Sequence, residues 1–288
     1  MAQSSSRRNR SGDKAQQLLL LGISLVGVAA FLYPFVLSVA NDVGLETSAH
    51  ADDAPFLFAL LTGVCLAASL IATGDDVTGT GRAKTVALLG VLIAIDATLR
   101  LVPGVLGASP IFALIIMVGA VFGASLGFQM GALTVLLSAF LTGGVGPWLP
   151  FQMFAAAWIG MSAGWLPRLE SMRLRVGMLA VFGAFWGLLF GAVMNLSFWP
   201  LSTAGLEVDA GLYWNPDLGF AETISRYSRF YLTTSLVFDL TRSIANVVLI
   251  AFLGAPVLRL LDRYQSRFTW QPWQETHSTV TTSSADLG

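Results

Sequence analysis

Charged residues are scarce in this chain of 288 residues and are unevenly distributed along it. Asp, Glu, Lys and Arg make up 11% of the sequence, whereas they make up roughly a quarter of ordinary soluble domains. None of them occurs between Ser109 and Pro167. A soluble domain needs a polar face, whereas a charge at the centre of a bilayer costs about 2.5–3.5 kcal/mol. The uncharged segment therefore argues against a soluble fold and indicates a membrane protein.

Cysteine and histidine are also nearly absent. The single cysteine, Cys65, lies in an apolar run, which excludes a disulfide framework or a cysteine metal cluster. The two histidines, His50 and His277, lie outside the apolar runs. The sequence thus predicts no catalytic residue, no metal site and no covalent cofactor, and therefore no enzyme. A net charge of −1, with no run that mixes basic and aromatic residues, also predicts no nucleic-acid partner.

A motif for ATP hydrolysis is missing as well. Residues 79–85 read GTGRAKT, which lacks the adjacent Gly-Lys pair that places a lysine over phosphates in a P-loop. A cytoplasmic connector is the simpler interpretation. If the chain takes part in ATP-driven transport, the ATPase is another polypeptide.

Long apolar runs are what the sequence does have, with 55% hydrophobic residues and a mean hydropathy of +0.71. Each run of about 20 apolar residues is long enough to span a bilayer. An all-α polytopic membrane protein with about eight helices is predicted, at 17–40, 55–73, 84–102, 109–124, 127–142, 148–166, 175–197 and 229–258. The two short runs 109–124 and 127–142 could instead form a kinked or re-entrant pair.

The runs divide into four predicted regions. A basic N-terminal tail covers 1–16, and two accessory helices with their linker cover 17–83. A core of six helices covers 84–258, and a polar tail covers 259–288. The first run exceeds the apolar length of a signal peptide, so a retained helix is favoured over a cleaved one.

Lysine and arginine predict the orientation, because cytoplasmic loops are enriched in both. With the N-terminus inside, the outer segments hold only Arg226 and Arg229. The inner segments and the adjoining helix ends hold twelve: Arg7, Arg8, Arg10, Lys14, Arg82, Lys84, Arg168, Arg173, Arg175, Arg259, Arg263 and Arg267. Both termini are therefore predicted to be cytoplasmic, in a plasma membrane.

Small residues recur at every fourth position in several runs, which lets neighbouring helices approach closely. Glycines at 119, 123, 127 and 131 are predicted to share one helical edge. Similar stripes are Ala156/Gly160/Gly164, Gly183/Gly187/Gly191 and Gly90/Ala94. Most are expected to serve internal packing, whereas the last could face lipid or a partner subunit.

Four ionisable residues lie in predicted spans or at their ends. Asp96 and Arg100 are four apart, and Asp239 and Arg242 are three apart, with Asn246 continuing the second stripe. Residues of this kind in a span are functional candidates by default. Alternatively, each pair neutralises itself on adjacent turns and stabilises helix packing. The sequence leaves both interpretations open.

A second group of candidates lies at the predicted outer ends of the helices. Aromatic residues there commonly form an interfacial belt, but apolar walls with a few amides also describe a small-molecule site. The loop 198–228, long enough to serve as a lid, belongs to this region. The candidates are Trp148, Phe151, Gln152, Asn195, Trp199, Tyr213, Trp214, Asn215 and Tyr231, with Arg100 at the outer end of its helix.

The segment 122–167 resembles the substrate-binding S component of energy-coupling factor (ECF) transporters. The run LTGGVGPWLPFQM at 141–153 carries the resemblance, which extends over about 84–258 and is closest to the actinobacterial cobalamin or corrinoid group. It implies a six-helix bundle that binds a vitamin at its extracellular side. The bundle would dock, through small residues matched here by Gly90 and Ala94, on a T component with two cytoplasmic ATPases, which alone use ATP.

Three other functions remain open at this stage. An ion-coupled carrier could use Asp239 or Asp96. An intramembrane enzyme is disfavoured by the shortage of paired histidines, cysteines and carboxylates. A scaffold or sensor without a ligand is the third.

Overall fold

A computed structural model describes residues 18–32, 35, 55–56, 58–67, 79–102, 104, 106–201, 211–214 and 217–268. Every regular element within these ranges is a helix. The fold is that of an all-α polytopic membrane protein, as the hydropathy predicts. Predictions for the N-terminal tail, for most of the linker before residue 79, for Asn215 and for 269–288 fall outside the described residues.

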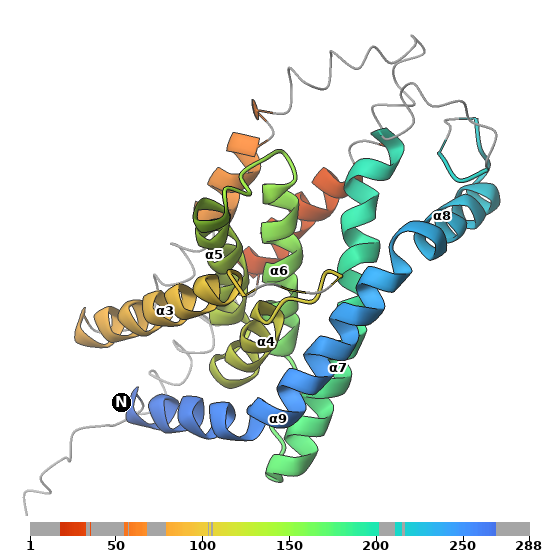
Figure 1. Cartoon of the computed structure of the whole chain (residues 1–288). Coiled ribbons are helices and arrows are strands. Elements are labelled where there is room, and N and C mark those ends of the chain that lie inside the picture. Colours follow the sequence, from red (N-terminus) through yellow and green to blue (C-terminus); the bar gives the residue numbers. More distant parts are fainter. Residues whose placement is uncertain are drawn as a thin grey trace, which may run out of the picture.

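Figure 1 shows the described helices in chain order. Residues Leu18–Leu32 and Phe58–Ala67 form two apolar helices in the N-terminal part. They are followed by α3 (Gly79–Leu99), α4 (Ile111–Phe122), α5 (Ala124–Thr142), α6 (Leu149–Ala163), α7 (Met172–Phe198), the short η1 (Trp199–Leu201), α8 (Phe220–Thr234) and α9 (Leu236–Phe268).

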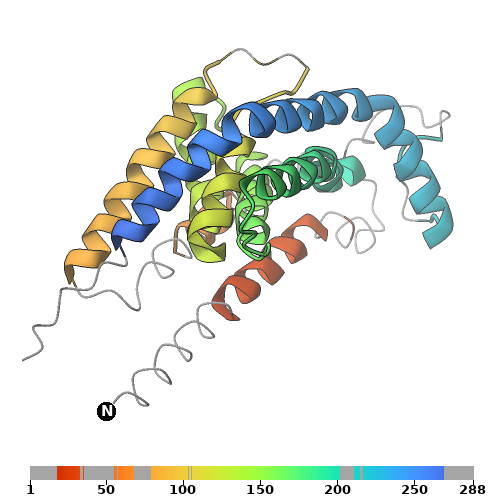
Figure 2. The same cartoon turned by 90° about the horizontal axis from the view of Figure 1, so that it is seen from below.

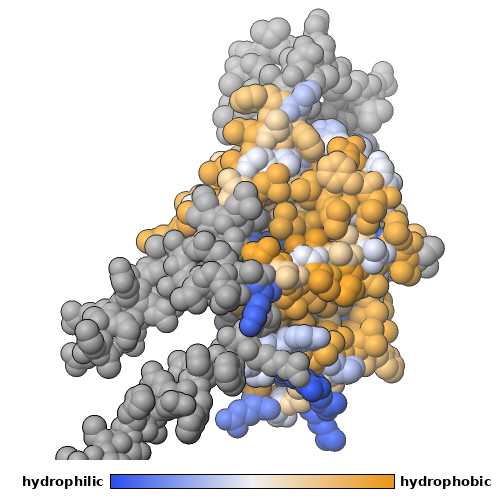
Figure 3. All heavy atoms as spheres, turned by 90° about the vertical axis from the view of Figure 1, so that its left-hand side faces the viewer, coloured by the Kyte–Doolittle hydropathy of each residue, from blue (hydrophilic) through white to orange (hydrophobic). Residues whose placement is uncertain are grey.

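Three helices are long and apolar enough to cross a membrane by themselves: 124–142, 172–198 and 236–266. Large apolar side chains on α7 and α9 face outward, including Val181 (72% exposed) and Phe252 (79% exposed). Figure 3 shows a broad apolar face with hydrophilic side chains gathered toward one end. An exposed apolar surface of this kind is what contact with lipid requires.

The helix α6 lies at the centre of the bundle. Most of its side chains are buried, and its small residues face the glycines of α4 and α5. A Cβ on Gly127 or Gly160 would collide with the backbone of the other residue. The predicted close approach of helices through small residues is therefore present between α5 and α6.

The prediction that all four glycines share one helical edge is wrong. Gly123 adopts φ +95° and ψ 174°, which ends α4 and starts α5. Only glycine reaches that backbone conformation at little cost. The chain therefore folds back at this residue, with Gly119 on α4 and Gly127 on α5 brought together against Gly160.

The predicted span 229–258 is also divided, into α8 and α9. Ser235 stays in the right-handed helical region but departs from regular helix geometry (φ −118°, ψ −28°), and its hydroxyl accepts a hydrogen bond from Asn195 Nδ2 at 2.7 Å. α9 then continues through Phe268, past the predicted end. Pro256 lies inside α9 and removes one backbone donor, and Figure 1 shows α9 bent before its C-terminal end.

An ion pair joins the first turn of α7 to the last part of α9. The two guanidinium nitrogens of Arg175 contact the carboxylate of Asp262 at 2.7 and 3.1 Å. The start of α7 and the end of α9 therefore lie at the same end of the molecule. Arginines also cluster there in the sequence, at Arg168 and Arg263.

The N-terminal helix 18–32 packs on α6, on the opposite side of the central helices from α9 (Figures 1 and 2). Trp158 donates a hydrogen bond to Ser24 at 3.1 Å. The rings of Phe31 and Phe151 lie 5.0 Å apart. This accessory helix is therefore packed into the bundle rather than tethered beside it.

Candidate functional site

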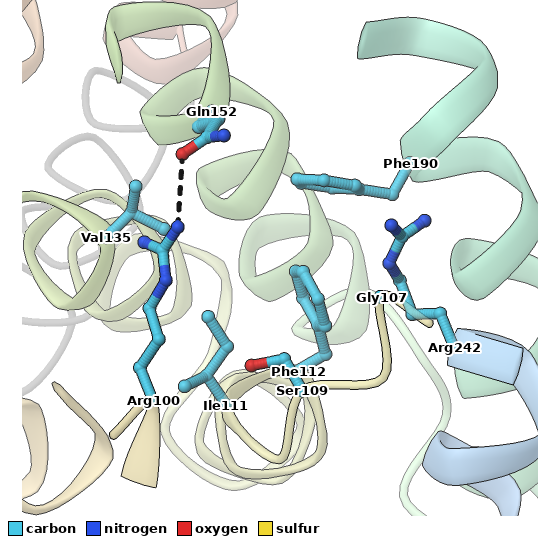
Figure 4. Close-up of a pocket in the computed structure, with 9 residues that line it drawn as sticks. All are labelled: Arg100, Gly107, Ser109, Ile111, Phe112, Val135, Gln152, Phe190 and Arg242. Carbon is cyan, nitrogen blue, oxygen red and sulfur yellow. Dashed lines mark hydrogen bonds between the residues drawn. The ribbon is translucent and has the colours of Figure 1, made fainter. Parts of the chain in front are cut away.

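A cavity of about 160 Å³ lies between six helices, α3 to α7 and α9, or the loops at their ends (Figure 4). The cavity lies toward the same end of the bundle along each of these helices. It lies just after the end of α3, near the starts of α4, α6 and α9, and near the ends of α5 and α7. Nine residues line it: Arg100, Gly107, Ser109, Ile111, Phe112, Val135, Gln152, Phe190 and Arg242.

Arg100 forms one wall of the cavity, and its side-chain hydrogen bonds go to neutral groups. Its Nη1 donates to the hydroxyl of Ser138 at 2.9 Å, and its Nη2 donates to the amide oxygen of Gln152 at 3.4 Å. Ser138 in turn donates to the carbonyl of Val135 at 2.9 Å. Among the described residues Arg100 makes no ion pair, so its charge has no carboxylate partner within them.

Arg242 forms the facing wall, between two aromatic rings. Its guanidinium carbon lies 5.0 Å from the ring centre of Phe190 and 5.9 Å from that of Phe112, within cation–π distance. It is ion-paired with Asp239 one turn earlier, and its Nη1 also donates to the carbonyl of Gly187 at 3.2 Å. Its Nε–H, although buried, has no hydrogen-bond partner within the described part of the chain.

The loop between α3 and α4 closes the cavity from below in Figure 4. Leu106 and Gly107 adopt positive φ values of 48° and 83°. A Cβ on Gly107 would lie 3.4 Å from Arg242 Nη2, so glycine lets the loop approach the guanidinium. The hydroxyl of Thr241 donates to the Leu106 carbonyl and so attaches the loop to α9.

Polar side chains of α9 are bonded to the backbone of α7. The hydroxyl of Ser243 donates to the carbonyl of Ala184 at 2.7 Å, and Asn246 Nδ2 donates to that of Gly183 at 2.9 Å. These contacts need the small residues of α7, since a Cβ on Gly187 would lie 2.5 Å from Ser243 Cα. The stripe predicted from Asp239, Arg242 and Asn246 therefore holds α9 against α7, and Arg242 alone of the three also lines the cavity.

The Asp96–Arg100 pair does not form. Asp96 is fully buried in α3, and neither of its carboxylate oxygens has a hydrogen-bond partner among the described residues. Arg100 follows the last residue of α3 and turns toward Ser138 and Gln152 instead. An i,i+4 pair needs both residues in the same helix, and α3 ends at Leu99, one residue before Arg100.

The predicted outer aromatics form a separate cluster. Trp199, Trp214 and Phe230 are buried together, with Tyr213 and Tyr227 packed against them. Trp199 donates to the carbonyl of Leu212 at 3.0 Å, which fastens the segment before α8 to the end of α7. These side chains fill an apolar cluster, here called the outer cluster after its predicted position, between the end of α7 and α8, and they do not line the cavity.

The remaining predicted residues are dispersed. Trp148 is half-exposed and donates to the Gly144 carbonyl, and Phe151 packs on the N-terminal helix. Asn195 binds Ser235, and the hydroxyl of Tyr231 donates to the Leu188 carbonyl at 3.3 Å. Of the predicted binding residues, the structure brings only Arg100 and Gln152 to the cavity, together with Arg242 from the predicted intramembrane set.

Several cavity residues were not predicted. Phe112 and Phe190, 4.8 Å apart, look in the sequence like any other apolar residues of a span. Ser109 and Gly107 belong to a short connection without a distinguishing motif. No signal in the sequence alone separates these four from packing residues.

The exposed face of α3 carries the predicted docking pair. Gly90 and Ala94 are both exposed, and an added Cβ on Gly90 would have no atom within 4 Å. Val86, Val91 and Ile95 are exposed beside them. This face is therefore unoccupied by the described helices.

Residue types that bind metals do not gather in the described ranges, where no three of His, Cys, Asp and Glu lie close enough to hold an ion.

One family model matches the chain. It describes the substrate-specific component of ECF transporters, and it matches residues 84–254. No curated protein and no solved structure matches the chain.

Proposed function

The chain belongs to the family of ECF transporter substrate-specific components, and we propose that it binds a vitamin in the cavity between Arg100 and Arg242. The family match begins within α3, covers α4 to α8 and ends within α9. The chain is thus a membrane subunit of an ECF importer. The identity of the solute and the position of its site are the proposal.

A single observation carries this proposal. Among the described residues, α3 to α7 and α9, with the loops at their ends, converge on one cavity that contains both polar and aromatic side chains. Ligand sites in helical bundles have this composition, with apolar walls and a few placed polar groups. The cavity also lies at the end opposite the Arg175–Asp262 ion pair. On the lysine and arginine pattern that end is extracellular, which suits uptake.

The volume favours a small vitamin. Sites for drug-sized ligands have volumes of about 300–1,000 Å³, and this cavity has about 160 Å³. A corrinoid, which the sequence resemblance implies, is far larger than that. A smaller solute is therefore proposed.

The partners are proposed to be a T component and two ATPases in the cytoplasm. The exposed face of α3 at Gly90 and Ala94 offers a surface on which another helix could approach closely. An independent carrier that uses Asp239 is less favoured, because Asp239 is already paired with Arg242.

Reconstitution in proteoliposomes tests the function. The purified chain is compared with the chain assembled with a T component and ATPases, with ATP enclosed on the cytoplasmic side, and uptake of a panel of labelled vitamins is measured. Accumulation only in the assembled complex supports the proposal. Accumulation by the chain alone, driven by an imposed proton or sodium gradient, would replace it with the carrier.

A further inference from the structure

The cavity has a positive charge that the described residues do not balance. Two guanidinium groups, those of Arg100 and Arg242, face it, and arginine stays protonated in proteins. Asp239 pairs with Arg242 and does not line the cavity. Asp96, one turn before Arg100, makes no ion pair and does not line it either. Because Arg242 is already paired, the unbalanced charge is that of Arg100, which is half-buried and makes no ion pair among the described residues, so an anion in the cavity would be stabilised.

Unsatisfied polar atoms mark where such an anion could bind. Arg242 Nε and Ser109 Oγ both lack hydrogen-bond partners among the described residues, and both residues line the cavity. Arg100 faces them from the opposite wall, held in place by Ser138 and Gln152 (Figure 4). Buried polar groups in native structures nearly always have partners, so a ligand is a natural source of those missing here.

The rest of the lining is apolar. Phe112 and Phe190 lie with ring centres 4.8 Å apart, and Ile111 and Val135 complete the wall. A cavity of about 150 Å³ holds one benzene molecule. The ligand would therefore have an apolar body of about one ring, with its charge at one end.

From these features, and on the basis of the proposed function, we propose that the transported solute is a small monocarboxylate whose carboxylate binds between Arg100 and Arg242 while its apolar body packs on Phe112 and Phe190. Planar carboxylates suit the fork of donors that arginine presents. Inorganic phosphate lacks the apolar body that these walls would cover.

Matched pairs of ligands test the charge requirement. The full chain, purified in detergent, is titrated with benzoate and benzamide, and with cyclohexanecarboxylate and its amide, by isothermal titration calorimetry. We expect each carboxylate to bind at least about tenfold more tightly than its amide, since a charge-assisted hydrogen bond contributes more than 1.4 kcal/mol. Equal affinities, no binding by either carboxylate, or tighter binding of inorganic phosphate would overturn the inference.

Variants of the two arginines then test which side chains bind the carboxylate. Arg100→Gln should remove the preference for carboxylate over amide, and Arg242→Lys, which keeps the charge, should retain part of it. Arg259→Gln makes the same change at an exposed arginine far from the cavity and should leave the preference intact. A preference that persists in Arg100→Gln while the thermal unfolding temperature is unchanged would contradict the site.

The outcome for the inference can be separated from that for the proposed function. If the chain does not bind carboxylates but still supports ATP-driven uptake of an uncharged vitamin, the proposed function stands and only the inference fails. If the chain neither assembles with a T component nor supports uptake, the proposed function is wrong, whatever ligand the chain binds.

Discussion

Gly187 on α7 lies directly against Ser243 on α9, so that a Cβ on the glycine would be only 2.5 Å from the serine Cα. This contact brings the α7 backbone within hydrogen-bonding distance of three successive polar side chains of α9. The same register places Arg242 beside Phe190. The packing of α7 on α9 and the composition of the cavity are therefore linked.

Gly187→Ala should destabilise the protein, because the added methyl group must displace the backbone of α9. Overpacking of this kind costs about 1–3 kcal/mol. The measurement is thermal unfolding in detergent. Gly177→Ala on the same helix is the matched control, since nothing lies within 4 Å of its Cβ, and it should stabilise the helix slightly. Equal unfolding temperatures for the two variants would contradict the proposed contact.

Asp239→Asn should lower stability more than ligand affinity. Removing one partner of a buried ion pair costs about 3–5 kcal/mol, because the arginine is left buried without its counter-charge. A bound carboxylate would restore that charge, so benzoate should raise the unfolding temperature of the variant more than that of the parent protein. Unchanged stability with loss of gradient-driven uptake would instead favour an ion-coupled carrier.

Gln152→Ala and Trp214→Ala should have different effects. Gln152 accepts a hydrogen bond from Arg100 in the cavity, so its removal should weaken ligand binding by about 1 kcal/mol with little change in unfolding temperature. Trp214 is buried in the outer cluster, where truncation costs about 3–5 kcal/mol of stability. Calorimetry and thermal unfolding of both variants separate these effects, and a reversed pattern would move the binding site to the outer cluster.

Gly90→Leu should prevent assembly with a T component while leaving ligand binding intact. The leucine would project from an exposed face where no described residue contacts it, so folding should not change. Gly63→Leu, at another glycine with open space around it, provides the control. Co-purification of a tagged T component measures assembly. Normal recovery with Gly90→Leu would mean that this part of α3 is not the docking face.

Local patterns predicted much of the fold correctly. The uncharged segment from Ser109 to Pro167 indicates a membrane core, and the structure builds α4, α5 and α6 from it. The glycine-rich run at 143–148 was predicted to connect two helices, and it does. A pair on adjacent turns was one of the two interpretations left open for Asp239 and Arg242, and that pair forms. Each of these follows from residues close together in the chain.

Other predictions failed where a single backbone angle decided the outcome. Gly123 turns one glycine edge into a contact between two helices, and Ser235 divides one predicted span into two. Hydropathy does not register the turn at Gly123, because the residues on both sides of it remain apolar. Arg100 is a similar case, since the end of α3 separates it from Asp96.

The sequence by itself determined that this protein is a bundle of membrane helices, because hydropathy and charge are properties of each segment taken alone. It also supplied the resemblance to ECF S components. Only the tertiary structure brought Arg100 and Arg242 to opposite walls of one cavity, from the end of α3 and the start of α9. That arrangement depends on how closely six helices pack. The closeness is decided by contacts of glycines with residues far away in the chain.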